Sequence, residues 1–167
     1  MFAIGTEEEA GFILYYHLQA QASTNSWEYP EPPEGWTRLG SGCYRVAYLA
    51  PSGVVYKVQG RYDKDGDRRW QSNFSEVQNL RRHHLKRLPK GCRIPRWNSF
   101  EFPEGKIVVA MEKFDRLVRS LTWQEREDTR EARVRMLDAV DGIYDTHDAN
   151  LAYDDKTKEV AIIDWGG

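Results

Sequence analysis

The residues best suited to chemistry lie near the C-terminal end of the sequence. Asp145 precedes Asn150 by five positions, and Asp164 follows a short run of apolar residues. A carboxylate can accept the proton of an attacking hydroxyl group, and carboxylate and amide oxygens are ligands that Mg²⁺ accepts beside phosphate groups. We therefore predict that Asp145 is a general base and that Asn150 and Asp164 hold a metal ion. Because Asp and Asn are also common in polar loops, a purely structural loop is the alternative.

A second group of residues is suited to holding phosphate. Gly40, Ser41 and Gly42 lie in an expected turn between two strands, where glycines let backbone N–H groups approach phosphate oxygens. Lys57 lies in an apolar strand sequence, and Glu76 follows it by 19 positions on an expected helix. A lysine in such a strand needs a partner, and Glu76 could reach back toward it. The alternatives are a glycine turn without a ligand and a lysine on a solvated sheet face.

These residues must be positioned by strands and helices, which the apolar spacing and the turn residues indicate. The spacing of Ala10, Ile13, Leu14 and Leu18 predicts an amphipathic helix over residues 7–21, and a proline-rich linker follows it. Short connections favour an antiparallel arrangement of the strands. The expected strands span residues 36–42, 44–50, 54–58, 96–102 and 106–112.

Two further helices and a last pair of strands complete the expected fold. The helix predicted at residues 69–88 has an apolar stripe of Phe74, Val77, Leu80, His84, Leu85 and Leu88. Thr122 followed by Glu125 is a capping-box pattern, which begins a long helix that ends near residue 140. Short strands are expected at residues 150–153 and 160–163. The predicted regions are a helix with linker (1–34), a sheet-rich lobe (35–114) and a region with the polar loops (115–167).

The order of these features resembles the protein-kinase-like superfamily, including its aminoglycoside and small-molecule kinase branches. The sequence Asp164-Trp165-Gly166 is similar to the kinase DFG motif, and it follows counterparts of the glycine loop, the strand lysine, the helical glutamate and the catalytic loop. The resemblance covers residues 36–167. It implies an α+β fold with a kinase-like N-lobe, made of a five-stranded antiparallel sheet and a helix of the αC type, and with a strongly reduced C-lobe.

The resemblance also implies roles for the candidate residues and implies ATP and Mg²⁺ as cofactors. The glycine turn would cover the ATP phosphates, Lys57 paired with Glu76 would hold them, and Asp145 would be the catalytic base. Asn150 and Asp164 would bind Mg²⁺. The hinge would follow the fifth strand, and the residues near adenine would be Met111, Glu112 and Phe114. Met111 is equally explained as an ordinary core residue.

Three features depart from the kinase pattern. Arg45 stands where a third glycine is common, and Ile143 stands where a histidine usually braces the catalytic loop. Bracing of this loop must therefore come from elsewhere. The sequence ends at Gly167, so we expect no activation segment and no full set of C-lobe helices. Compact proteins of this kind are similar to kinase-like proteins of bacteriophages and bacterial effectors, so we expect a phage or bacterial source.

The activity that the resemblance implies is ATP-dependent phosphoryl transfer, by a minimal protein Ser/Thr kinase that acts on a host or partner protein. Two alternatives stay open. One is a pseudokinase-type nucleotide-binding module or inhibitor that transfers no phosphate, and the other is a small-molecule kinase. A homodimer could supply the support that a short C-lobe lacks.

The composition argues against several other classes of function. A formal net charge of −2 over 167 residues gives no global field that would attract nucleic acid or an anionic membrane. The basic residues between positions 81 and 96 could contact phosphate, but a solvated helix face also explains them. Cys43 and Cys92 match no metal-binding spacing, and no apolar run approaches the roughly 18 residues that span a bilayer. We therefore expect a cytoplasmic protein that binds neither membrane nor nucleic acid.

Overall fold

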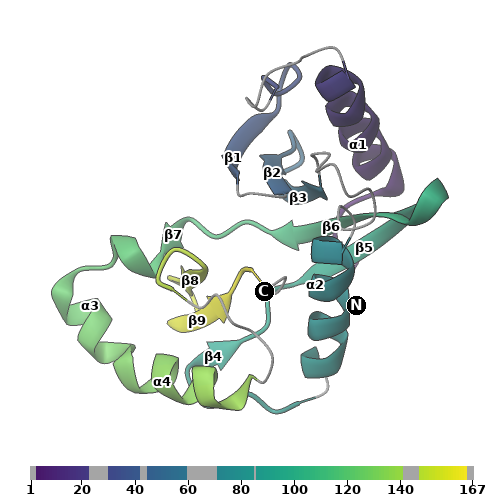
Figure 1. Cartoon of the computed structure of the whole chain (residues 1–167). Coiled ribbons are helices and arrows are strands. Elements are labelled where there is room, and N and C mark those ends of the chain that lie inside the picture. The colour runs from purple at the N-terminus through teal and green to yellow at the C-terminus, as the bar shows by residue number, and fades with distance from the viewer. Residues whose placement is uncertain are drawn as a thin grey trace. The chain divides into compact units, whose positions relative to one another are not determined.

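The computed structural model of the chain describes residues 3–22, 30–41, 45–59, 71–84, 86–140 and 147–164. The chain divides into two compact units, one of Met1–Phe74 with Arg96–Lys113 and the other of Ser75–Pro95 with Phe114–Gly167. Figure 1 shows the helices and strands of both units, coloured in chain order. The domain boundaries predicted at residues 34 and 114 remain predictions.

Within the described residues, the first unit contains a five-stranded antiparallel sheet in the order β1-β2-β3-β6-β5. Its strands are β1 (Thr37–Ser41), β2 (Arg45–Leu49), β3 (Val54–Gln59), β5 (Trp97–Phe102) and β6 (Lys106–Glu112). The short 3-10 helix η2 (Pro103–Gly105) joins β5 to β6, where the proline and glycine predict a turn. All five expected strands are present, and the predicted α+β fold class is confirmed.

Helix α1 (Glu7–Ala22) packs one face on this sheet and supplies part of the core. Complete burial of an aliphatic side chain contributes about 1.5–3 kcal/mol, so this face anchors the helix. Leu18 is partly buried against the same core, as its spacing predicts. The Nδ1 atom of His17 lies 2.7 Å from the Tyr48 hydroxyl, which pairs two buried polar groups. The buried positions of α1 are Ala10, Ile13, Leu14 and His17.

Helix α2 (Gln71–His84) follows β3, and its buried face differs from the predicted stripe. Phe74 is 52% exposed and His84 is also exposed, so their prediction as buried residues is wrong. In the first turn of α2 the buried residue is Asn73 instead, because its side-chain amide donates to the backbone oxygens of Lys57 at 3.0 Å and Ile107 at 2.7 Å. Leu85 lies outside the described residues. The buried positions of α2 are Asn73, Glu76, Val77, Leu80 and His83.

In the part of the second unit that the structure describes, a four-stranded sheet has the order β4-β9-β8-β7. The pair β4–β9 is parallel, and the other two pairs are antiparallel. The two-residue strands β4 and β7 were not predicted, because such short segments carry no period-two pattern. The strands are β4 (Cys92–Arg93), β7 (Arg116–Leu117), β8 (Leu151–Asp154) and β9 (Glu159–Ile162).

The single helix predicted from Thr122 to about residue 140 is two helices, α3 (Trp123–Asp128) and α4 (Arg130–Ala139), after the 3-10 helix η3 (Val118–Ser120). The predicted capping box is confirmed, since Thr122 and Glu125 exchange both expected hydrogen bonds. The helix breaks at Thr129, whose hydroxyl donates to the backbone oxygen of Glu125 at 2.9 Å. A threonine that bonds back to the preceding turn disturbs helical continuity. No helix of the described residues has the length and apolar character needed to cross a bilayer.

Candidate functional site

The two candidate metal ligands lie at one end of the β8–β9 hairpin. Leu151 pairs with Ile162 in the register of this hairpin. One position further, the backbone N–H of Ile163 donates to the backbone oxygen of Asn150 at 2.9 Å. Asp164 follows directly, and Asn150 and Asp164 are both half-buried. The hairpin therefore brings these two residues, which are 14 positions apart in the sequence, to the same end of one element.

The loop before β8 is a compact turn that carries Asn150. The N–H of Asn150 donates to the backbone oxygen of His147 at 2.8 Å, and the N–H of Ala149 donates to the His147 ring nitrogen Nδ1 at 3.2 Å. The imidazole of His147 therefore stabilises the turn itself. Asp145, the predicted base, lies outside the described residues.

Asp148 joins this loop to helices α3 and α4 of the second unit. One carboxylate oxygen pairs with Nη2 of Arg126, and the other lies 3.4 Å from Nη1 of Arg133. The backbone N–H of Arg119 also donates to the backbone oxygen of Asp148 at 3.3 Å. Sequence reasoning missed this cluster, because the arginines lie 22 and 15 positions before the aspartate. The available signal was their seven-residue spacing, which would place both on one face of the single helix that the sequence predicts there.

Lys57 lies on β3, an inner strand of the sheet in the first unit, between Ala47 of β2 and Val109 of β6. Lys57 is 8% exposed, so the alternative of a lysine on a solvated sheet face is wrong. A buried ammonium group requires partners that compensate its charge. The surroundings of Lys57 must therefore supply such partners. The backbone of the same residue holds the first turn of α2 through Asn73.

Glu76 is a fully buried carboxylate on α2. It follows Asn73 by three positions and therefore lies on the buried face of the helix. An ionised carboxylate is buried only where partners compensate its charge, so this residue does not belong to a solvated helix face. The pairing of Glu76 with Lys57 remains a prediction.

The glycine turn begins on an open surface. Gly40 pairs with Ala47, and the register of β1 shifts between Arg38 and Gly40. A methyl group added at Gly40 would meet no other atom within 4 Å, so packing in the described structure does not require glycine there. Ser41 is exposed at the end of β1. Gly42 lies outside the described residues.

The three residues predicted near adenine have different surroundings. Met111 is 2% exposed and pairs with Val55 and Trp97 across the sheet, as a core residue does. The Glu112 carboxylate accepts from the backbone N–H of Arg96 at 2.6 Å and closes the end of the β5–β6 pair. In the second unit, the guanidinium of Arg93 lies 4.8 Å from the ring centroid of Phe114. Their role in binding adenine remains a prediction.

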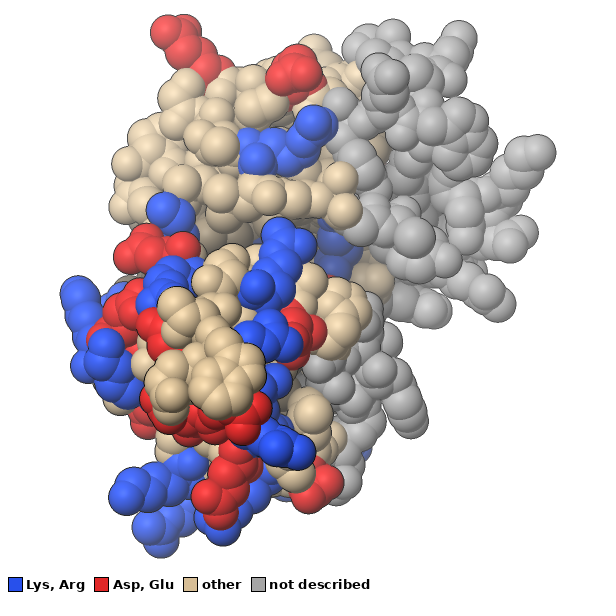
Figure 2. Space-filling model, turned by 90° about the vertical axis from the view of Figure 1, so that its left-hand side faces the viewer, with Lys and Arg blue, Asp and Glu red and all other residues tan. Residues whose placement is uncertain are grey.

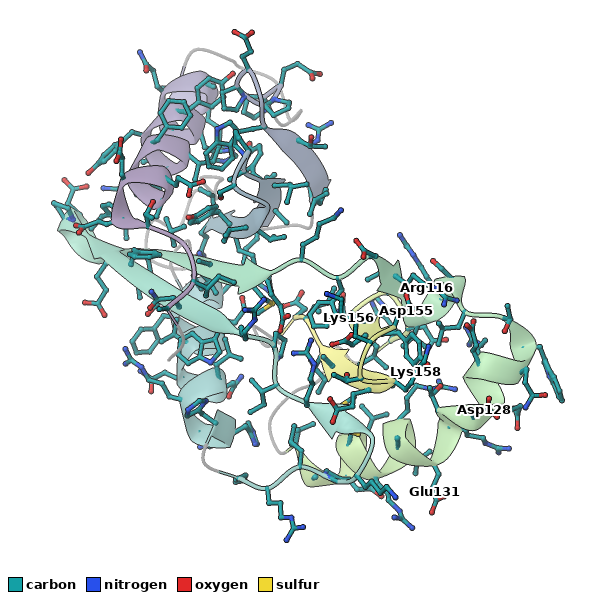
Figure 3. The ribbon with its side chains drawn as sticks, turned by 180° about the vertical axis from the view of Figure 1, so that it is seen from behind. Arg116, Asp128, Glu131, Asp155, Lys156 and Lys158 are labelled. Atoms are coloured by element: carbon teal, nitrogen blue, oxygen red, sulfur yellow. The ribbon has the colours of Figure 1, made fainter. Side chains whose placement is uncertain are left out.

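Arg116 fastens β7 to α3 and to the β8–β9 turn, and Figure 3 labels it beside Asp155. Its Nη1 atom lies 2.9 Å from Oδ1 of Asp155, and its Nη2 atom lies 2.5 Å from Oε2 of Glu125. The guanidinium lowers the pKa of Glu125 to about 2. Burial raises the pKa of Asp154, but hydrogen bonds from Arg93 and from backbone N–H groups outweigh it and lower the pKa to about 2.

The candidate ligands at the end of the hairpin fit Mg²⁺ better than they fit a metal ion that is coordinated by protein side chains alone. Among the described residues, no group of three or more His, Cys, Asp or Glu side chains could hold a metal ion. One carboxylate from Asp164 and one amide oxygen from Asn150 are few ligands. Mg²⁺ is commonly held by one or two carboxylates together with substrate phosphates and water, so this pair suits an ion that arrives with a nucleotide.

Comparison with known proteins finds a structural similarity but no match to a protein family. No protein-family model matches the chain, and no curated protein matches it. A solved structure of the GDP and kanamycin complex of APH(2")-IIia is similar over 68% of this chain and 38% of its own chain, with 12% sequence identity and a TM-score of 0.46. The match therefore spans well under half the length of that protein. A likeness of this degree establishes neither family nor activity for the chain.

Proposed function

We propose that the chain is an ATP-dependent phosphotransferase of the protein-kinase-like type and that its acceptor is a Ser or Thr hydroxyl of a host or partner protein. The observation that carries the proposal is the row Gly40–Ala47–Lys57 in the first unit. Residues opposite one another in an antiparallel sheet project from the same face. This register gives Gly40, at the start of the glycine turn, and the buried Lys57 a common face, which supports the proposal that both contact phosphate.

The second support is the hairpin that brings Asn150 and Asp164 together. In the proposal these residues bind the metal ion that accompanies ATP, which would supply positive charge to the β- and γ-phosphates. Lys57 holds the phosphates, and Glu76 orients Lys57. The assignment of these roles rests on the sequence order and on the surroundings of each residue.

The reaction assigned to these residues is an in-line phosphoryl transfer. The acceptor hydroxyl forms a new bond to the γ-phosphorus, and the bond between this phosphorus and the leaving oxygen of ADP breaks. The hydroxyl proton goes to Asp145, which the sequence places five positions before Asn150. The role of Asp145 rests on this spacing alone.

A protein acceptor is favoured by the surface beside the loop that carries Asp148. Trp123 is 75% exposed and Val134 is 53% exposed, and both line a shallow depression of about 330 Å³ that also includes Asp148. Exposed aromatic and aliphatic side chains bordered by arginines are typical of protein-binding surfaces. In Figure 2 the side of the molecule that carries α3 faces the viewer, with charges of both signs around uncharged residues.

The test is incubation of the purified protein with γ-labelled ATP and Mg²⁺, with and without a bacterial lysate. Wild type is compared with Asn150→Ala, Asp164→Ala and Asp145→Ala, and the control is Asp138→Ala, an exposed carboxylate on α4. The proposal expects label on the protein or on a lysate protein, lost in the three site variants and kept in the control. If label transfers to none, but ATP still raises the melting temperature in a Lys57-dependent way, the chain is a nucleotide-binding module.

A further inference from the structure

Two arginines of the second unit each bond to Asp148 at one end and to a backbone oxygen at the other. Arg126 pairs with the carboxylate through Nη2 and donates through Nη1 to the backbone oxygen of Val118 at 3.3 Å. Arg133 reaches the carboxylate through Nη1 and donates through Nη2 to the backbone oxygen of Arg126 at 3.0 Å. The network therefore ties η3, α3 and α4 to one aspartate of the loop before β8.

The environment of this network makes it stronger than an exposed ion pair. The side chains of Arg133, Asp148 and Arg126 are 17%, 33% and 37% exposed. Isolated exposed pairs contribute about 0–1 kcal/mol, whereas charge-assisted bonds that share one acceptor in a partly shielded network are stronger and fix geometry. Each oxygen of Asp148 has its own arginine, so the carboxylate is held in one orientation.

Asp148 lies close to Asn150 in the chain, so a fixed Asp148 carboxylate also restricts the position of Asn150. The two residues belong to one turn, closed by the hydrogen bond from the Asn150 N–H to the His147 oxygen at 2.8 Å. Asn150 in turn receives the N–H of Ile163, the residue before Asp164. A shift of Asp148 would therefore displace Asn150 relative to Asp164.

We propose that Arg126 and Arg133 are positioning residues, which act through Asp148 to keep Asn150 aligned with Asp164. The sequence leaves this task unassigned, because Ile143 stands where a bracing histidine is expected. The catalytic consequence rests on the proposed function, whereas the hold on the turn does not. Substitution of residues that orient metal ligands without binding the metal typically lowers metal affinity or activity by about 10–100-fold.

The experiment compares Asp148→Asn and the double variant Arg126→Gln/Arg133→Gln with the control Arg130→Gln. Arg130 lines the same depression, but its side chain is 71% exposed, and it pairs with Glu127 of the neighbouring helix at 3.8 Å. Hydrogen exchange is measured on a peptide that covers residues 147–151. Phosphoryl transfer is measured against Mg²⁺ at saturating ATP and against ATP at saturating Mg²⁺.

We expect exchange in this peptide to become about tenfold faster in Asp148→Asn and in the double variant, and to stay unchanged in the control. The Mg²⁺ concentration at half-maximal activity should rise about tenfold, while KM for ATP changes less than about twofold. Unchanged exchange in both variants overturns the inference. A fall in kcat with an unchanged Mg²⁺ requirement also overturns it, since that result indicates a merely structural role. If wild type transfers no phosphate, the proposed function fails and the exchange measurement alone decides whether the arginines hold the turn.

Discussion

Gly40 and Lys57 lie in one cross-strand row of the five-stranded sheet, with Ala47 of β2 between them. Adjacent strands are about 4.8 Å apart, and opposite residues in a row share a face of the sheet. The backbone at Gly40 and the long side chain of Lys57 therefore lie on the same face of this sheet.

Gly40→Ala should weaken nucleotide binding while it leaves folding nearly unchanged. Among the described residues, no atom beyond the neighbouring residues of the chain lies within 4 Å of the added methyl group, so the free energy of unfolding should change by less than about 0.5 kcal/mol. The same methyl group would stand in the path of a phosphate that approaches the backbone. We expect the Kd for ATP with Mg²⁺ to rise about tenfold in calorimetric titration, which corresponds to about 1.4 kcal/mol.

Gly53→Ala is the matched control for this glycine. Its added methyl group also meets open space, but Gly53 has a φ of +85°, where an L side chain is strained. This variant should lose about 1 kcal/mol of stability and keep its ATP affinity. Equal ATP affinity in wild type and Gly40→Ala would contradict the phosphate-binding role of the turn.

Asn73→Ala should destabilise the first unit strongly for a single polar substitution. The amide of Asn73 donates to two buried backbone oxygens, those of Lys57 and Ile107, and both would lose this donor. Each buried polar group left without its bond costs about 1–3 kcal/mol, so we expect a loss of about 2–4 kcal/mol in urea unfolding. Gln78→Ala, at an exposed position of the same helix, should lose less than about 0.5 kcal/mol.

Acid should destabilise the second unit through Glu125 and Asp154. Their native pKa values of about 2 lie below the ordinary carboxyl values of about 4, so ionisation favours the folded state. This contribution is complete above the unfolded-state pKa and is lost as the pH falls through about 4 toward 2. The melting temperature should therefore fall over this range. Glu125→Gln should melt lower at neutral pH and show a smaller decrease on acidification, and an unchanged pH profile would contradict the role of the Arg116 pair.

Cys92 should resist alkylation in the folded protein. Its thiol is 7% exposed and donates to the backbone oxygen of Ala132 at 3.1 Å, and burial raises its pKa to about 11. Very little thiolate, the reactive form, is then present near neutral pH. In Cys43→Ser, iodoacetamide at pH 8 should modify Cys92 only after denaturation, as mass spectrometry can show. Rapid modification of the native variant would mean that β4 opens readily.

The strands of the first unit could be predicted because turn residues mark their ends. Proline and glycine at positions 51–53 and 103–105 separate runs of β-branched and aromatic residues, and the structure places β2, β3, β5 and β6 where these runs lie. Lys57 could be recognised from its apolar neighbours. Its position in line with Gly40 could not, because register depends on how many residues each turn uses.

Other features depended on contacts between distant residues. In the first turn of α2, Asn73 is buried through its bonds to the backbone of β3 and β6, whereas periodicity alone favoured Phe74. The helix break arises from the hydroxyl of Thr129, which a propensity scale does not report. The arginine network around Asp148 joins segments that only the fold brings together.

The parallel pair β4–β9 has a consequence for synthesis of the protein on the ribosome. Strand β4 (Cys92–Arg93) can pair with β9 (Glu159–Ile162) only after β9 has been synthesised. Until then, β4 stays without this partner strand in the nascent second unit. The sheet of the first unit can close as soon as β6 has emerged, well before that. Contacts between distant segments form slowly, and unfinished sheets are prone to aggregation. A prematurely terminated chain would therefore carry a complete first sheet but no β8–β9 hairpin, and it would be a natural target for cellular proteases.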